Sequence, residues 1–182
     1  MAKKRRYEKM KNEIIPAIKK RRSIRAYDPK GVVTDSQIEL LLEAAMLAPS
    51  ACNTRPWEFI VVKSREKLDK VASWHPWAKM LKTAQIGIIV CGLPDVQVGK
   101  SGEGMWQHDC GAATQNILLQ AAEMNLGSCW CGLHPVQKYM DETRKLFDIP
   151  KNVVPFCIIA VGKPAEDFGS RGFYEDEKVS WV

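Results

Sequence analysis

Apolar residues recur at intervals of three and four in several segments of the chain, the spacing that places them on one face of an α-helix. The clearest segment begins at Thr34 or Asp35, either of which can cap a helix, and ends before Pro49. Segments of this kind predict helices at about residues 7–22, 35–48, 64–73, 106–125 and 135–147. Gly127 is predicted to terminate the fourth of them.

Runs of β-branched, aromatic and other apolar residues predict the strands. Residues 86–91 are continuously apolar, so we expect that strand to be buried on both faces. Residues 57–62 form another strand, residues 128–132 an edge strand and residues 153–161 a central one. Between them, residues 93–104 contain one Pro and three Gly and are predicted to form a loop.

Helices and strands alternate without the order of a regular βαβ repeat. This predicts an α+β fold, a three-layer α-β-α sandwich with a mixed central sheet flanked by helices. No repeat or linker divides the chain, so residues 1–182 form a single domain. Residues 1–12 are a basic extension, and residues 163–182 carry little core material and are expected to pack on a partner subunit.

A content of 46% hydrophobic and 26% charged residues is ordinary for a soluble globular protein. No apolar run reaches the roughly 20 residues that a membrane-spanning helix needs. The basic start of the chain has no apolar segment behind it and is not a secretory signal. We therefore predict a cytoplasmic protein.

The charge is uneven along the chain. Residues 1–25 contain eleven Lys and Arg but two acidic residues, a local charge of +9 in a chain of net charge +6, so the rest nets −3. Such a segment could touch nucleic acid or an anionic membrane. A solvated helix face is favoured, because no aromatic residues are interleaved with the charges, so neither partner is predicted.

The six cysteines include no Cys-x-x-Cys pair, which argues against a zinc site or an iron–sulfur cluster. Cys129 and Cys131 lie on a predicted strand, where we expect them to point to opposite faces. Disulfides are not expected in the cytoplasm. No metal site is predicted.

Two segments carry candidate chemistry. Arg21-Arg22-Ser23-Ile24-Arg25 offers three guanidinium groups and a hydroxyl, which suit a phosphate, although a basic helix end bonding its own carbonyls is the alternative. The segment from Pro49 to Trp57 is small and polar, so a flat ring could lie against its backbone while an amide reads the ring edge. Ser50 and Asn53 could instead only stabilise a turn, and Arg55 could form a surface ion pair. Together the segments indicate a phosphorylated aromatic cofactor, with flavin mononucleotide (FMN) as the leading candidate.

With Gln115-Asn116 and Gly162-Lys163-Pro164, these motifs resemble the FMN-dependent nitroreductase family over almost the whole chain, from about residue 14. The resemblance implies an α+β homodimer that binds FMN in clefts at the dimer interface, with residues from both chains. Its members reduce electron-poor acceptors with NAD(P)H.

Carried over to this sequence, the resemblance implies the following contacts. Arg21, Arg22 and Ser23 would hold the phosphate, and Arg25 would approach the pyrimidine edge. The partner subunit would line the ring with Pro49, Ser50, Ala51, Asn53 and, less specifically, Arg55. The backbone of Cys131 and Gly132 would face flavin N5, and Gly162, Lys163 and Arg171 would close the phosphate end.

The sequence departs from the family pattern at three places. Arg55 stands where Gln is usual, and Cys131 stands where an acidic residue is frequent. The segment from Leu93 to Trp106 is too short for the helical lid of larger members, so we expect an open pocket.

The implied mechanism passes hydride from NAD(P)H to flavin N5 and then two electrons to an acceptor such as a nitroaromatic or a quinone, with ping-pong kinetics. Arg25 would stabilise the reduced, anionic flavin, and no side-chain base is required. The Gly-x-Gly-x-x-Gly and Walker A patterns are absent, so no nicotinamide domain is predicted. Two alternatives are a non-catalytic flavin-binding module and another flavin chemistry, such as reductive dehalogenation.

The histidines left alternatives open. His75, with Trp74 and Trp77, could pack in the core or line the rim of the flavin site. His108 and Asp109 are lone residues before the long helix, where they could act as a cap pair.

Overall fold

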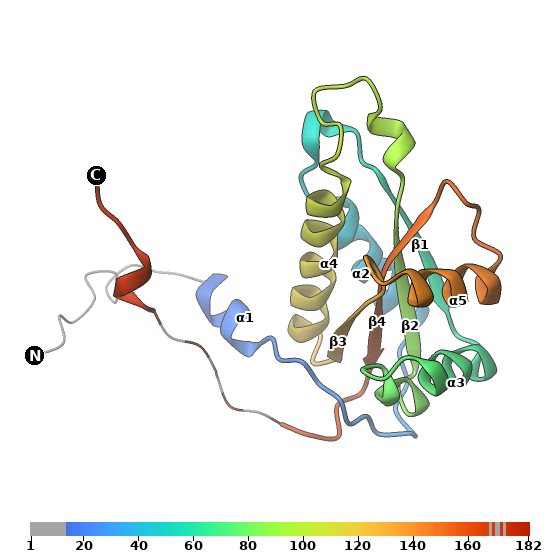
Figure 1. Ribbon diagram of the computed structural model, residues 1–182. Coiled ribbons are helices and arrows are strands. Elements are labelled where there is room, and N and C mark those ends of the chain that lie inside the picture. The colour runs from blue at the N-terminus through green and yellow to red at the C-terminus, as the bar shows by residue number, and fades with distance from the viewer. Residues whose placement is uncertain (1–13, 168, 170–171, 173) are drawn as a thin grey trace, which may run out of the picture.

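Figure 1 shows the computed structural model, which describes residues 14–167, 169, 172 and 174–182. The predicted basic extension, residues 1–12, lies outside this part of the chain. The described helices are α1 (Ile14–Lys20), α2 (Asp35–Met46), α3 (Arg65–Trp74), α4 (Trp106–Glu123) and α5 (Gln137–Phe147). The described strands are β1 (Trp57–Val62), β2 (Ile86–Gly92), β3 (Gly127–Gly132) and β4 (Val154–Gly162).

The four strands form one sheet in the order β1-β2-β4-β3, and every neighbouring pair is antiparallel. The prediction of a mixed sheet was therefore wrong. Val62 at the end of β1 pairs with Gly87 at the start of β2, because the connection through α3 returns the chain to the end of the sheet at which β1 finished. Among the described residues, parallel pairing is limited to the isolated bridge between Ser23 and Ser128.

The predicted three-layer architecture is confirmed. Helices α2 and α4 cover one face of the sheet, and α3 and α5 cover the other (Figure 1). Successive strand residues alternate between the two layers: Ile88 and Val90 pack under α4, whereas Ile89 and Cys91 face α3. The strands that were predicted to be buried and central, β2 and β4, occupy the middle of the sheet.

Local signals define the helix starts. Thr34 and Gln37 form a capping box at α2, and the Ser64 hydroxyl accepts the backbone N–H of Lys67 at α3. The end of α4 differs from the prediction. Asn125 adopts a left-handed conformation (φ 56°) directly after the helix, and Gly127 is already the first residue of β3. A Cβ atom at Gly127 would lie 2.7 Å from Cγ2 of Ile24, so this glycine permits a close approach of two chain segments.

The first helix ends at Lys20, two residues earlier than predicted. The reason is tertiary: the backbone N–H of Ile24 donates to the carbonyl of Ser128 at 3.0 Å, which holds the following residues extended beside β3.

Helix α1 and the C-terminal segment extend away from the sandwich (Figure 1). Helix α1 buries none of its residues, and Ile14, Ile15 and Ile18 are exposed. Trp181 is 90% exposed. In the described part of the chain, no helix combines the length and the apolar character that a bilayer crossing requires.

Candidate functional site

The predicted phosphate-binding segment lies along the outer edge of β3. Ser23 forms a bridge with Ser128, and the Tyr27 hydroxyl donates to the carbonyl of Ile24 at 2.9 Å. The carboxylate of Glu166 accepts the backbone N–H groups of Arg25 and Ala26. These contacts fix the backbone of the segment and leave its guanidinium groups beside the sheet edge.

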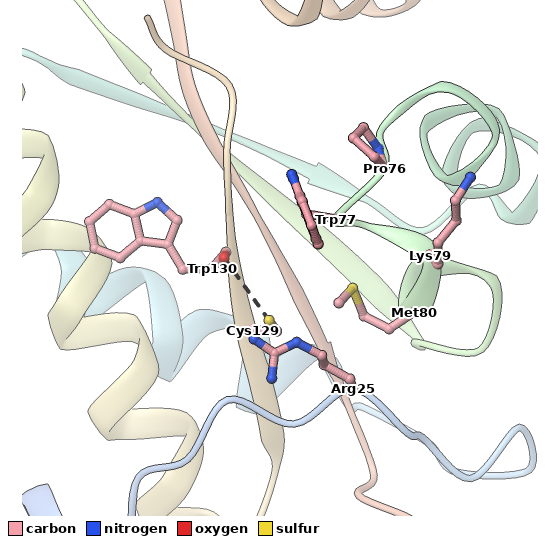
Figure 2. Close-up of a pocket in the computed structure, with 7 residues that line it drawn as sticks. All are labelled: Arg25, Pro76, Trp77, Lys79, Met80, Cys129 and Trp130. Carbon is pink, nitrogen blue, oxygen red and sulfur yellow. Dashed lines mark hydrogen bonds between the residues drawn. The ribbon is translucent and has the colours of Figure 1, made fainter. Parts of the chain in front are cut away.

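A hollow of about 370 Å³ opens next to this segment. Figure 2 shows its lining: Arg25 lies below Cys129 and Trp77 lies across from them, whereas Trp130 borders the hollow with its backbone and turns its indole away to the other side of β3. Lys79 and Met80, from the short 3-10 helix Lys79–Lys82, close the far side. Trp77 is 76% exposed, so a broad aromatic surface stands at the entrance. The hollow combines the flat surface of one exposed indole with the positive charge of Arg25 and Lys79.

The positive charge affects the pKa of a thiol on β3. A hydrogen bond from Cys131 and the guanidinium groups of Arg25 and Arg21 lower the pKa of Cys129 to about 7, against the opposing effect of burial. Arg25 lines the hollow, and Arg21 contributes to the positive potential at Cys129 from the start of the same segment. The expectation that Cys129 and Cys131 point to opposite faces was wrong, because residues two apart on a strand share a face, and both lie in the layer with α3.

The backbone groups of β3 alternate between its partner strand and its outer edge. The Ser128 carbonyl accepts from Ile24, and the Gly132 carbonyl lies 2.8 Å from His75 Nε2, so Ser128, Trp130 and Gly132 face outward. The backbone of Cys131 faces β4. This geometry favours the amides of Trp130 and Gly132 over the predicted Cys131 amide as donors to a molecule in the hollow.

The residues predicted to close the phosphate end lie near the same edge. Gly162 ends β4, where a Cβ atom would overlap the Gln85 side chain, so close packing also explains this glycine. The backbone N–H of Lys163 donates to Gln85 Oε1 at 2.7 Å, and its side chain is exposed. Arg22 is half-buried beside Lys20 in a neighbouring hollow. Arg171 lies outside the described residues.

The second predicted segment, Pro49 to Arg55, does not reach this hollow. It contributes none of the lining residues, and Pro49, Cys52, Asn53 and Arg55 are exposed at another place. Arg55 lines a hollow of its own beside α2.

Helix α4 separates the two segments. Asp109, in its first turn, accepts the backbone N–H of Ala51 at 3.1 Å, whereas the carbonyl of Glu123, at its last residue, accepts Lys20 Nζ at 3.5 Å. An 18-residue helix is about 27 Å long. One small ligand therefore cannot contact both segments of the same chain.

Asp109 was considered as a helix cap, and that expectation was wrong. The cap position is Met105, which has no side-chain cap, and Asp109 is buried among contacts with Ala51 and Gln97. Isolated in the sequence, it carried no signal for this role.

His75 packs in the core, one of the two alternatives. It is 1% exposed and stacks on Tyr139 with ring centroids 4.5 Å apart. Its Nδ1 accepts the backbone N–H of Trp77, so Nε2 carries the proton and donates to the Gly132 carbonyl. Among the described residues, no three His, Cys, Asp or Glu side chains are grouped to hold a metal ion.

Comparison with known proteins identifies the family of this chain. The profile of the nitroreductase family matches residues 18–85 and 72–163. The chain belongs to the nitroreductase family.

Relatives within the family cover almost the whole chain. A protein of Methanothermobacter thermautotrophicus, provisionally named NADH dehydrogenase/NAD(P)H nitroreductase, is 43% identical over 93% of this chain and 86% of its own. A Bacteroides thetaiotaomicron structure with the same provisional name has a TM-score of 0.87 at 40% identity, covering 94% of this chain and 98% of the other. A Desulfovibrio desulfuricans structure, provisionally named a nitroreductase and crystallised with FMN, has a TM-score of 0.77 at 26% identity, with coverage of 94% and 98%.

The burial of His75 predicts a pH dependence of stability in this nitroreductase. Burial lowers the pKa of the imidazole below its ordinary value of 6.5. Below pH 6.5 the unfolded chain binds a proton that the folded protein refuses, so the free energy of unfolding should fall until the pH reaches the folded-state pKa. In urea titrations at pH 7.5 and 5.5, His75→Gln should show a smaller decrease than the wild type.

The exposed His108 provides the matched control, since His108→Gln should retain the wild-type decrease. Burial also lowers the pKa of His134, so part of the decrease should remain in both variants. An undiminished decrease in His75→Gln would contradict the assignment.

Proposed function

We propose that this protein is an FMN-dependent oxidoreductase, which takes reducing equivalents from NAD(P)H and passes two electrons to an electron-poor acceptor such as a nitroaromatic or a quinone. The observation that carries the proposal is the hollow beside the extended segment Arg21–Arg25, which is lined by Arg25, Lys79 and the exposed indole of Trp77. The names of the relatives and the FMN complex of a structural neighbour support the same cofactor and reductant. A cytoplasmic location remains part of the proposal.

The residues that line the hollow, together with those of the adjoining segment Arg21–Ser23, fit FMN. Arg21, Arg22 and Ser23 would hold the phosphate with charge-assisted hydrogen bonds, aided by Lys163 and Arg171. The flat ring would lie against the outer edge of β3, where an edge strand offers unpaired N–H and C=O groups. Trp130 and Gly132 turn their backbone groups to that edge.

FMN, when bound, supplies hydride acceptance and two-electron transfer. The protein supplies position and charge. Arg25 places a fixed cation beside the ring, which favours an electron-rich, anionic ring over a neutral one. Trp77, which is 76% exposed, offers a flat surface for reactants at the entrance to the hollow. Between Leu93 and Met105 the described chain has one short 3-10 helix, Pro94–Gln97, so no long helical lid covers the site.

The site is completed by a second copy of the chain in this proposal. The segment from Pro49 to Arg55 lies at the opposite end of α4 from Arg21–Arg25, so its ring contacts must come from a partner. Exposed apolar residues are available for such an interface. They lie on α1, on α2 and in the C-terminal segment: Ile14, Ile15, Ile18, Leu40, Met46, Leu47, Val179 and Trp181.

The first prediction concerns the phosphate contact. Arg21→Ala should lower FMN affinity tenfold or more, because a lost charge-assisted hydrogen bond costs about 1.5–3 kcal/mol. Riboflavin, which lacks the phosphate, should bind the variant and the wild type equally. Lys19→Ala, an exposed cation on α1, is the matched control. Fluorescence titration measures all of these affinities, and unchanged FMN binding in Arg21→Ala would place the phosphate elsewhere.

A second prediction concerns the order of the reaction. In this proposal the nicotinamide and the acceptor use the same face of the ring, so the nicotinamide must leave before the acceptor enters, and double-reciprocal plots at several acceptor concentrations should be parallel. Anaerobic NAD(P)H should bleach the flavin without any acceptor present. Intersecting lines would indicate a ternary complex, and a flavin that no nicotinamide bleaches would indicate a binding module.

A third prediction tests the shared site. In a heterodimer with Arg21→Ala in one chain and Asn53→Ala in the other, sites built from both chains place both changes in one site and leave the second intact. The heterodimer should therefore retain one tightly bound FMN. Sites built within single chains would retain none. Doubly tagged heterodimers, purified and assayed for FMN content, distinguish the two arrangements.

A further inference from the structure

The loop that follows α2 contains an unusual concentration of strained backbone. Cys52, Asn53 and Arg55 have φ values of 51°, 53° and 50°. Residues with a Cβ atom seldom adopt this left-handed conformation, and each instance costs free energy that other contacts must offset. Three instances within four residues require a strong local constraint.

A buried hydrogen-bond network supplies that constraint. Asp109 accepts the Ala51 N–H at 3.1 Å through Oδ1, and it accepts Gln97 Nε2 at 2.8 Å through Oδ2. Gln97 Nε2 also donates to Thr54 Oγ1 at 3.0 Å, and this hydroxyl donates to the Ala51 carbonyl at 2.8 Å. The network ties both ends of the segment 51–54 to two other elements, α4 and the 3-10 helix Pro94–Gln97.

The two central side chains are almost wholly withdrawn from water. Gln97 is 0% exposed and Asp109 is 6% exposed. Burying a carboxylate is unfavourable unless hydrogen bonds compensate, and a site that needed only packing would be more stable with apolar residues. Both carboxylate oxygens of Asp109 are used in holding the loop in place.

The strained residues do not contribute to the hydrophobic core of this chain. Cys52, Asn53 and Arg55 are exposed, and none belongs to either hydrophobic cluster. The backbone is therefore held in an unfavourable conformation at a surface, which is the arrangement expected of a preorganised contact surface.

We propose that Asp109 and Gln97 are positioning residues that hold the loop 51–55 in the conformation that receives the flavin ring. The inference rests on the proposed function, in which this loop meets the ring bound to a partner subunit. Neither side chain touches the cofactor. Both act through Ala51 and Thr54. Because they order the loop before the flavin binds, the free energy of binding does not include the cost of ordering it.

The proposal separates two kinds of binding defect. Because the loop contacts the ring, its loss should weaken FMN and riboflavin by the same factor. Arg21→Ala, at the phosphate, should weaken FMN alone. A general loss of folding would instead lower the amount of binding-competent protein, which the stoichiometry of the titration reports.

The test uses the full-length protein stripped of flavin, with affinities for FMN and riboflavin from fluorescence titration. Asp109→Asn turns an N–H₂ group toward the donor of Gln97, and we expect both affinities to fall about tenfold. The double variant Asp109→Asn/Gln97→Glu restores the donor–acceptor pair between positions 97 and 109 with reversed polarity but removes the donor to Thr54, so it should recover part of both affinities. Rescue of this kind is not expected from a change that only loosens the core.

Thr54→Val is the second variant, in case Asp109→Asn does not fold. It removes the hydroxyl at constant shape and leaves the buried carboxylate intact. It should lower both affinities threefold or more, because both neutral hydrogen bonds of this hydroxyl are lost.

The outcomes distinguish a failure of the positioning role of Asp109 and Gln97 from a failure of the proposed function. Wild-type affinities for both flavins in folded Asp109→Asn, or in Thr54→Val, would overturn the inference and leave the proposed function standing. Loss of FMN affinity alone would also overturn it, because the network would then act on the phosphate end. A wild-type protein that binds neither flavin would overturn the proposed function, and the inference with it.

Discussion

The site depends on the attachment of residues 21–25 to the edge of β3. The hydrogen bond from Ile24 to Ser128, the Tyr27 hydroxyl and the Glu166 carboxylate together stop the first helix at Lys20 and keep the next residues extended. Without these contacts, the arginines would continue around a helix and face different directions. With them, Arg25 lines the hollow and Arg21 stands at the start of the same extended segment.

Most of the fold could be predicted from periodicity and caps. The helix starts at Thr34 and Ser64 and all four strands follow local signals, because each reflects a few neighbouring side chains. Strand direction could not be predicted in the same way. It depends on the return path of the α3 connection, a property of the tertiary structure. The end of α1 escaped prediction for the same reason, since its cause lies more than a hundred residues away at Ser128.

The candidate site was predicted unevenly. The motif Arg21–Arg25 could be recognised in the sequence, because guanidinium groups so close in sequence are also close in space. The role of Asp109 could not, because its partners Ala51 and Gln97 come from separate segments. The assignment of a backbone donor to Cys131 stays a prediction, but the strand register turns that backbone toward β4, because neighbouring residues face opposite edges of a strand. Family resemblance supplied the idea of a shared site, and the position of α4 supplies a physical reason for it.

The outer edge of β3 has a further consequence. An exposed edge strand invites another polypeptide to pair with it and is a common starting point for aggregation. Here Ile24 blocks one end at Ser128, and the imidazole of His75 blocks the other at Gly132. Only the backbone around Trp130 is left between the two blocks, too short a stretch for a foreign strand to add to. The attached segment and the buried histidine thus protect this edge of the sheet from pairing with another polypeptide.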